Sequence, residues 1–322
     1  MDALDEKRYK LMLTGTGHTY RYYSSVHPDK TTILFIHGFP HTANIWRVHI
    51  AKFEKLGFGC VAPDMLGLGG SDKSYNPGDY CSKNLANNLV EILDAECASH
   101  AVVIGHDWGC QVASRMALYH TSRVQSLMLA AVPYYTPGSF DLKAINELTA
   151  HAVGYSVFGY WDTFLSETKL LKEHTESFFS LFYAQDPELW KNHFMDRGAL
   201  KVWLENDLTC AIGEYVTELE RQEFFANDWA AGTQYYRCYV ENCHWKIEQD
   251  LAPEAHIITV PSLMIASSED ACAPLPVVTS TLDSFTDVRL AVLEGGHNAF
   301  LSRAEEFITE VSDFLRERKM LE

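Results

Sequence analysis

The stretch Gly105-His106-Asp107-Trp108-Gly109 decides the fold. It follows a short apolar run, residues 101–104, that favours a β-strand, and it precedes residues 110–119, whose apolar side chains recur at helical spacing. A strand, a G-x-D-x-G turn and a helix form a nucleophile elbow, in which the glycines let the chain turn sharply and let helix and strand approach closely. The pattern predicts that the Asp107 side chain projects above the carboxyl edge of a sheet.

The central residue of this elbow is Asp rather than the better-known Ser, which indicates a reaction class. A carboxylate is ionised at neutral pH and needs no base to become a nucleophile. It attacks ester and amide carbonyls poorly, because the mixed anhydride is high in energy, but it can displace a leaving group from a saturated carbon. Water activated by a histidine can then hydrolyse the alkyl ester. Asp107 therefore favours epoxide opening or carbon–halogen cleavage; the alternative is a turn aspartate that caps the next helix.

The segments around the elbow alternate between strand and helix patterns, which predicts an α/β fold with a mostly parallel sheet flanked by helices. Residues 9–24 have the alternation of a β-hairpin, and residues 31–36 form an unbroken apolar run typical of a strand buried on both faces. The further predicted strands are residues 31–36, 60–62, 124–132, 262–267 and 288–293, and the further predicted helices are residues 43–56, 84–98 and 300–318.

Residues 134–250 interrupt this alternation. They contain no buried-strand run, and their aromatic residues are numerous in stretches that favour helices. The sequence therefore predicts a core of residues 1–133 and 251–322, and a helical cap, or lid, of residues 134–250 inserted into it. The alternative is that these helices belong to one continuous domain.

The composition limits the partners and the compartment. The 322 residues carry a formal net charge of −17 and no Lys/Arg run of the nucleic-acid-binding type, so nucleic acid is disfavoured and a neutral substrate is favoured. The eight cysteines form no CxxC pair or zinc pattern, which is typical of buried free thiols in a reducing compartment. No signal peptide is apparent, and no apolar run reaches the ~18 residues of a membrane span. We expect a cytoplasmic protein without metal or cofactor; a homodimer is left open.

Two further residues stand where an active site at a sheet edge needs them. Asp270 follows the predicted strand 262–267, and His297 follows the predicted strand 288–293. Because the carboxyl ends of parallel strands share one edge, both should lie beside Asp107, and the chain order nucleophile, acid, histidine is the one the elbow predicts. His297 would take a proton from water, and Asp270 would orient its ring and stabilise the imidazolium. Glu269 is a rival for the acid, and a surface turn is the alternative for His297.

With these residues, the chain resembles the α/β-hydrolase-fold epoxide hydrolases, the branch with an aspartate nucleophile. The stretch His37-Gly38-Phe39-Pro40 matches the HGxP motif of that family, the elbow matches its Asp motif, and Asp270 and His297 match its acid and base. The match extends over nearly the whole chain. It implies an α/β-hydrolase core with a helical cap, and hydrolysis of an epoxide to a vicinal diol through an ester on Asp107.

The resemblance also implies how the ester carbonyl is polarised. It places the oxyanion hole at the backbone N–H groups of Phe39 and Trp108, and two such donors would converge on the carbonyl that is hydrolysed. It further implies a loop shaped by Pro40 through a cis bond after Phe39. The residues expected to contact the substrate are His37, Phe39, Trp108, Tyr160, Trp161 and Tyr183.

Opening an epoxide also requires an acid, because an alkoxide is a very poor leaving group. The family supplies tyrosines from its cap. Tyr236, which directly precedes Arg237, resembles the second of the family's tyrosine sites, and Tyr155 resembles the first. Rivals are Tyr160, Tyr183 and Tyr235, and the alternative for any tyrosine here is packing with a locally bonded hydroxyl.

Three other functions share parts of this pattern. A haloalkane or haloacid dehalogenase has the same Asp-His-Asp set, but here Phe39 stands where many haloalkane dehalogenases present Asn or Glu, and the nearest Arg to the elbow is Arg115 on the following helix. A biosynthetic cyclase would open the epoxide with the substrate's own hydroxyl. A non-catalytic receptor usually shows a broken catalytic set. The expected partners are a small apolar or bulky epoxide and water.

Overall fold

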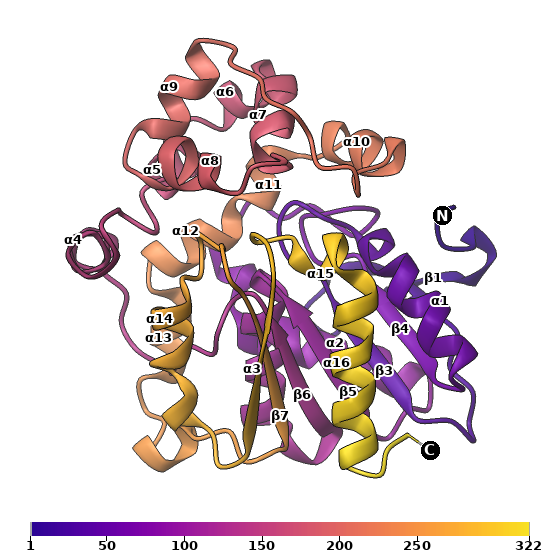
Figure 1. Ribbon diagram of the computed structural model, residues 1–322. Helices are drawn as coiled ribbons and strands as arrows, with labels where there is room; N and C mark the ends of the chain where they lie inside the picture. Colours follow the sequence, from indigo (N-terminus) through magenta and orange to yellow (C-terminus); the bar gives the residue numbers. More distant parts are fainter. Residues whose placement is uncertain (1, 322) are drawn as a thin grey trace.

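An eight-stranded sheet forms the centre of the protein in the computed structural model, which describes residues 2–321 (Figure 1). The strand order is β1-β2-β4-β3-β5-β6-β7-β8, with β1 and β2 antiparallel and the strands from β4 to β8 parallel. The strands are β1 (Tyr9–Leu13), β2 (Thr19–Ser24), β3 (Thr32–Ile36), β4 (Gly59–Pro63), β5 (Ala101–His106), β6 (Val124–Ala130), β7 (Ser262–Ser267) and β8 (Val288–Leu293). The predicted α/β class is confirmed.

Helices cover both faces of the sheet. In β3, Ile33 and Phe35 point into the core that contains α1 and α16, whereas Leu34 and Ile36 point into the core that contains α2 and α3. Burial on both faces explains why β3 is an apolar run in the sequence. These helices are α1 (Arg47–Lys55), α2 (Ser82–Ala95), α3 (Trp108–Tyr119) and α16 (Ala304–Glu317); short helices are η1 (Glu6–Arg8), η3 (Pro77–Tyr80), η4 (Thr121–Arg123), η6 (Pro253–His256), α14 (Leu275–Thr279) and η7 (Leu282–Ser284).

Two of the predicted helices are divided. The helix predicted at residues 43–56 begins as a 3₁₀ turn, η2 (Ala43–Trp46), in which the Thr42 hydroxyl accepts the N–H of Asn44, and α1 follows it. The helix predicted at residues 300–318 is α15 (Ala299–Ser302) followed by α16, because Arg303 between them leaves the helical region with φ of −120° and ψ of 40°. The apolar pattern continues across both breaks, so it does not reveal them.

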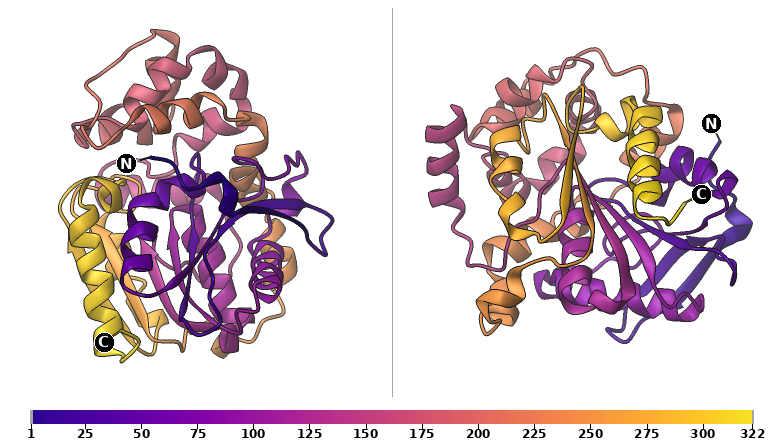
Figure 2. Two further views of the ribbon diagram at one scale, coloured as in Figure 1. Left: turned by 90° about the vertical axis from the view of Figure 1, so that its right-hand side faces the viewer. Right: turned by 60° about the horizontal axis from the view of Figure 1, so that its bottom comes forward.

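The chain between β6 and β7 is helical and is named the α4–α13 segment. Its only β pairing within residues 2–321 is an isolated bridge between Ala184 and Ile212. Helices α5 to α11 form a layer over one edge of the sheet, while α12 and α13 lie beside α3 (Figures 1 and 2). Its helices are α4 (Leu142–Val153), α5 (Trp161–Ser166), α6 (Thr168–Glu173), α7 (Thr175–Phe182), α8 (Glu188–Trp190), the π-helix η5 (Lys191–Met195), α9 (Ala199–Glu205), α10 (Glu218–Phe225), α11 (Trp229–Gly232), α12 (Gln234–Val240) and α13 (Cys243–Glu248).

Buried ion pairs join the α4–α13 segment to the helices beside the sheet. Arg115 of α3 binds Glu248 of α13 through two hydrogen bonds of 2.7 and 2.9 Å, and Arg47 of α1 pairs with Glu220 of α10. Both pairs are shielded from solvent, so removal of either partner would leave an uncompensated buried charge. Across residues 2–321, the structure has no helix with the combined length and apolar character needed to cross a membrane.

Candidate active site

The turn between β5 and α3 presents Asp107 at the carboxyl edge of the sheet. β5 ends at His106 and α3 begins at Trp108, and Asp107 between them has φ of 53° and ψ of −124°. This is a strained conformation for a residue with a Cβ atom. A Cβ atom on Gly105 would collide with the backbone of Gly109, so the glycines permit the close approach of strand and helix. The local geometry is that of the predicted elbow.

The loop after β3 holds one oxygen of the Asp107 carboxylate. The backbone N–H of Phe39 donates a hydrogen bond of 2.9 Å to Asp107 Oδ1. Gly38 packs against the same carboxylate so closely that any Cβ atom at this position would overlap it. The peptide bond between Phe39 and Pro40 is cis, as the resemblance implied. Trp108, the second predicted oxyanion donor, is the first residue of α3 and directly follows Asp107.

The other oxygen of Asp107 faces a histidine–aspartate pair. His297 Nε2 lies 3.6 Å from Asp107 Oδ2, and His297 Nδ1 lies 2.9 Å from Asp270 Oδ2. The other oxygen of Asp270 accepts two backbone N–H groups of the turn that follows it, at 2.8 and 3.2 Å. Asp270 follows β7 and His297 follows β8, so the three side chains meet at one sheet edge. Glu269, the rival acid, is exposed.

The charges of this cluster determine its protonation. Burial acts to lower the pKa of His297, but the carboxylates of Asp270 and Asp107 raise this pKa to about 10. Burial acts to raise the pKa of Asp270, but His297 and the two backbone hydrogen bonds hold that pKa below its ordinary value. His297 is therefore an imidazolium at neutral pH, placed between the side chains of Asp107 and Asp270.

Two residues that the sequence did not single out hold His297 in place. The Trp190 ring stacks on the imidazole with 5.2 Å between ring centroids and an interplanar angle of 28°. His106 Nε2 lies 3.2 Å from the backbone oxygen of His297, and the two rings are 4.9 Å apart. Trp190 comes from α8, far from the sheet edge in sequence, so no strand position indicated it. His106 lies in the elbow, but at a position of the G-x-D-x-G pattern that any residue can occupy.

A cavity of about 240 Å³ lies beside Asp107. Near the carboxylate its wall is aromatic and apolar, and its other part is polar, with the Arg115–Glu248 ion pair among its lining residues. The apolar lining includes Trp108, Val132, Phe140, Phe158, Tyr160 and Trp161, and the polar lining includes Gln111, Arg115, Asn242, His244 and Glu248. Three predicted substrate contacts, Trp108, Tyr160 and Trp161, therefore line this cavity.

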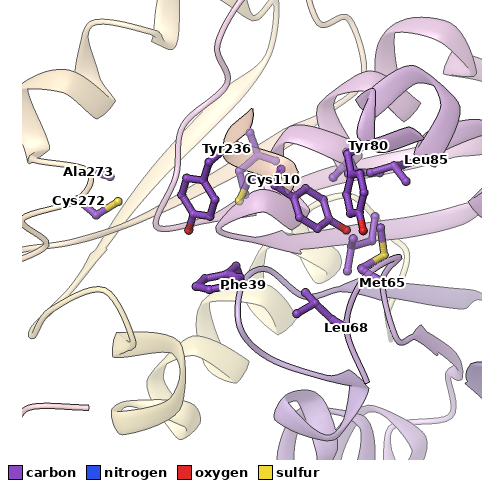
Figure 3. Close-up of a cluster of buried hydrophobic side chains, with 14 of the residues drawn as sticks. Phe39, Met65, Leu68, Tyr80, Leu85, Cys110, Tyr236, Cys272 and Ala273 are labelled. Atoms are coloured by element: carbon purple, nitrogen blue, oxygen red, sulfur yellow. The ribbon is translucent and has the colours of Figure 1, made fainter. Parts of the chain in front are cut away.

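The tyrosines do not all lie where the sequence predicted them. Tyr160 lines the cavity together with Asp107, and its ring is 5.9 Å from that of Tyr236. Tyr236 packs against Phe39 with 5.4 Å between ring centroids (Figure 3), and against Trp108 with 5.0 Å between ring centroids. Tyr155 is not part of the cavity lining, because its hydroxyl donates to the backbone oxygen of Ala271 at 2.9 Å. Tyr236 is also absent from that lining, so Tyr160 is the one of these three tyrosines that lines the cavity.

Both tyrosines near Asp107 keep their protons. Burial, together with the negative charge of Asp107, raises the pKa of Tyr236 well above its ordinary value. Burial likewise raises the pKa of Tyr160, and Asp107 adds to the effect. Each phenol is therefore neutral in the resting protein, and that of Tyr160, which lines the cavity, can donate a proton to an oxygen there.

Three other candidates have structural positions away from the cavity lining. His37 is predicted to contact the substrate, but its Nδ1 donates to the backbone oxygen of Gly38 and its Nε2 accepts the N–H of Met65, so it braces the loop after β3. Tyr183 packs among aromatic rings of α7 and α10. The hydroxyl of Tyr235 donates to the backbone oxygen of Leu66 at 3.0 Å. Phe39 approaches the site through its backbone and packs its ring against Tyr236.

A second cavity, of about 430 Å³, reaches the cluster from the side of His297. Its lining includes Trp190, Asn298 and the charged residues Glu269, Glu294 and Arg303, so it is more polar than the first. The two cavities share none of their lining residues. In residues 2–321, no group of three or more His, Cys, Asp or Glu side chains is arranged to hold a metal ion.

The fold and the elbow define the class of protein: the chain belongs to the alpha/beta hydrolase fold family, whose sequence model matches residues 31–304. The matched region contains the elbow, the loop after β3, Asp270 and His297. The predicted fold class and the resemblance to this family are therefore confirmed.

The relatives of the chain within this family are epoxide hydrolases by name. It is 27% identical over 289 residues to epoxide hydrolase A of Mycobacterium tuberculosis, a match that covers 85% of this chain and 84% of that protein. It is 26% identical over 241 residues to the bifunctional epoxide hydrolase 2 of Sus scrofa, covering 74% of this chain but only 42% of that longer protein. The crystal structure of epoxide hydrolase A from Mycobacterium thermoresistibile matches with a TM-score of 0.79 over 96% of this chain and 98% of that one, at 24% identity, which bears on the fold alone.

Proposed function

We propose that this protein is an epoxide hydrolase that converts an epoxide to a vicinal diol through an ester on Asp107. The observation that carries the proposal is the arrangement around this carboxylate. One oxygen is bonded to the Phe39 N–H, the other lies beside His297, and the neutral phenol of Tyr160 lines the same cavity. The names of the relatives support the same reaction.

In the first step, Asp107 Oδ2 attacks one carbon of the epoxide and an alkyl ester forms. The carbon–oxygen bond of the ring breaks, and the departing oxygen takes a proton from Tyr160 or Tyr236. Both phenols suit this role because burial and the nearby negative charge hold their protons until a more basic oxygen arrives. The strained elbow leaves Asp107 exposed to the cavity for the attack.

In the second step, water attacks the carbonyl carbon of the Asp107 ester. The ester has no negative charge, so one of the two charges that raise the pKa of His297 is gone. His297 then releases its proton to water and becomes a base, with Asp270 still orienting its ring through Nδ1. The Phe39 N–H, already on Oδ1, stabilises the oxyanion that develops there. The bond between the carbonyl carbon and the alkyl oxygen then breaks, the diol leaves with the proton that His297 took from water, and the Asp107 carboxylate is restored. Ester formation thus converts His297 from an imidazolium to a neutral imidazole that can act as a base.

The second cavity is the path by which we expect this water to reach His297. It reaches His297 from the side away from the first cavity and carries several charged side chains. A substrate that fills the first cavity would block the path to His297 from there, whereas water from the second cavity could still reach the imidazole. This division supports hydrolysis while the ester is in place.

The first cavity favours a neutral epoxide that is largely apolar. Aromatic rings form the wall near Asp107, and the net charge of −17 disfavours an anionic substrate. Arg115 reaches the polar part of the cavity, but its guanidinium is bound bidentately by Glu248 and is not available to a carboxylate of a haloacid. These features favour an epoxide over a haloacid.

We also propose that residues 134–250 act as a cap domain. The layer of α5 to α11 over the sheet edge supports this, because α5 is where Trp161 enters the cavity lining. The C-terminal part of this range has a second role, since α13 carries Glu248, the partner of Arg115. The boundary between cap and core therefore falls among helices that touch both.

The test is a panel of neutral aryl and alkyl epoxides, including styrene oxide, with the natural chain and Asp107→Ala. Diol formation is expected, and the substitution should reduce it by at least about 10⁴-fold because the nucleophile is lost. A single turnover in ¹⁸O-water should place the label in Asp107, since water attacks its carbonyl carbon. A fully active Asp107→Ala variant would overturn the mechanism.

The same experiment separates the alternatives. Halide release from a chlorinated alkane or fluoroacetate without diol formation would identify a dehalogenase. A cyclic ether from a hydroxy-epoxide, with no label in Asp107, would identify a cyclase. A folded protein that binds epoxides but never acquires the label would identify a receptor.

A further inference from the structure

Two cysteines and a histidine meet between α12 and the start of α2, outside the catalytic cluster. The Sγ atoms of Cys81 and Cys238 lie 3.8 Å apart, although the residues are 157 positions apart in the chain. His244 Nε2 lies 3.4 Å from Cys238 Sγ. Both cysteines are buried, and all eight cysteines of the protein are free thiols. The arrangement is therefore a buried pair of reduced thiols with a histidine beside it.

The hydrogen bonds of this cluster show which groups donate and which accept. The backbone N–H of Ser82 donates to His244 Nδ1 at 3.2 Å, so the neutral ring carries its proton on Nε2 and offers it to Cys238 Sγ. The thiol of Cys238 in turn donates to Cys81 Sγ. Burial lowers the pKa of His244 to about 3, so the ring stays neutral. The hydrogen bonds therefore run from His244 to Cys238 and from Cys238 to Cys81, whose sulfur is the last acceptor.

Cys81 is the more reactive of the two thiols. It is the N-cap residue of α2, a helix of 14 residues, whose N-terminal N–H groups favour a negative charge. The hydrogen bond from Cys238 lowers the pKa of Cys81, whereas burial raises the pKa of Cys238. The geometry therefore assigns Cys81 as the nucleophile and Cys238 as the thiol that keeps its proton.

We propose that Cys81 and Cys238 form a peroxide-sensitive dithiol site that oxidises reversibly to a disulfide and tethers α12 to the start of α2. A small oxidant can approach from the substrate cavity, because His244 lines it. The proposal does not depend on the epoxide chemistry, since neither cysteine lines the cavity.

The oxidation balances with a hydroperoxide as the oxidant. The Cys81 thiolate attacks one peroxide oxygen, the O–O bond breaks, and Cys81 becomes a sulfenic acid while hydroxide leaves as water. Cys238 Sγ then attacks the Cys81 sulfur, the S–O bond breaks, and a second water leaves with the proton of the thiol. Two thiols lose two electrons and two protons, and hydrogen peroxide becomes two molecules of water. A dithiol reductant such as dithiothreitol reverses the change.

The disulfide would connect the two parts of the fold. To form the bond, the sulfur atoms must approach from 3.8 Å to about 2.05 Å. The bond closes a loop of more than 150 residues, so it restricts the unfolded chain strongly. It also fixes α12, the helix that carries Tyr236.

The test is oxidation of the full chain by hydrogen peroxide, followed by alkylation of the remaining thiols and mass-spectrometric mapping of disulfide-linked peptides. A link between Cys81 and Cys238 is expected, with a Tm several degrees above that of the reduced protein; dithiothreitol should remove both. In Cys81→Ser neither should form, while the exposed Cys97 should be oxidised equally in both proteins.

The half-buried Cys243 provides the sharpest control, because it also lies close to Cys238. In Cys243→Ser the link between Cys81 and Cys238 should persist. A link between Cys238 and Cys243 in the natural chain, or no link at a peroxide concentration that oxidises Cys97, would overturn the proposal. A linked protein whose Tm equals that of the reduced protein would overturn the tether.

Discussion

The sheet edge and the helices above it supply the site in different ways. Asp107, Asp270 and His297 each follow a parallel strand, so their positions are set by a sheet whose strands end together. Tyr160 directly precedes α5 and Tyr236 lies in α12, and the orientation of these short helices depends on packing. A residue at the end of a buried strand has a predictable place, whereas a residue on a packed helix has one only after the helix is placed.

The tyrosine next to the cavity illustrates this difference. Tyr155 and Tyr160 are five residues apart, and both suit the motif of a tyrosine in an aromatic stretch. The backbone oxygen of Ala271 takes the hydroxyl of Tyr155, and the turn into α5 brings Tyr160 to the cavity instead. The sequence contains no feature that separates the two.

The largest expected effect concerns the sheet edge. In His297→Gln, Asp107 can still form the ester, but no base activates water, so steady-state diol formation should fall by at least about 10³-fold. The ester should accumulate, and intact-protein mass spectrometry should show a mass increase equal to that of one epoxide. Normal turnover, or complete absence of the adduct, would mean that His297 does not act in the second step.

A smaller effect is expected in the helices, where a matched pair of variants tests the choice of tyrosine. Tyr160→Phe should lower kcat by about 10²-fold, because one of two proton donors is lost. Tyr155→Phe removes a hydroxyl bonded to a backbone oxygen and should change kcat by less than about threefold, with a stability loss of about 1 kcal/mol. Steady-state kinetics and thermal unfolding measure both, and the reverse order of effects on kcat would restore Tyr155 as the acid.

The subtlest prediction concerns the titration of His297. In the folded protein its pKa is raised to about 10, above the value of about 6.5 in the unfolded chain. The stability that the imidazolium contributes is thus fully present below pH 6.5 and is lost as the pH rises to 10. Asp107→Asn removes one nearby charge, so NMR of the imidazole should give a lower pKa, and Tm should fall less steeply over this window. An unchanged pKa of His297 in this variant would show that the charge of Asp107 does not raise it.

The parallel strands and the helices that flank the sheet were predictable because the buried side chains of each element recur at a regular spacing in the sequence. Inner strands such as β3 and β5 are fully buried and mostly apolar, since helices cover both faces, whereas the edge strand β8 contains Arg289 and is only partly buried. The break at Arg303 was not predictable, because the apolar residues on both sides of it face the same core. Periodicity reports which side chains are buried, but a local change of φ and ψ leaves it intact.

The cysteines show the same limit. The sequence predicted buried free thiols, which is wrong for the exposed Cys97 and describes Cys81 and Cys238 without their relation. No spacing rule connects residues 81 and 238, because the sheet and the helical segment are joined only after folding.

By itself, the sequence determined the fold class and the three residues at the sheet edge, because a strand, a glycine-flanked turn and a helix leave little freedom in where the turn residue points. It also predicted attack on a saturated carbon, which is part of the proposed function, since Asp107 stands in the elbow. Only the tertiary structure decided that Tyr160 faces the cavity, that Trp190 stacks on His297, and that Cys81 meets Cys238. These contacts join segments far apart in the chain, and the packing of short helices, which no local pattern encodes, brings them together.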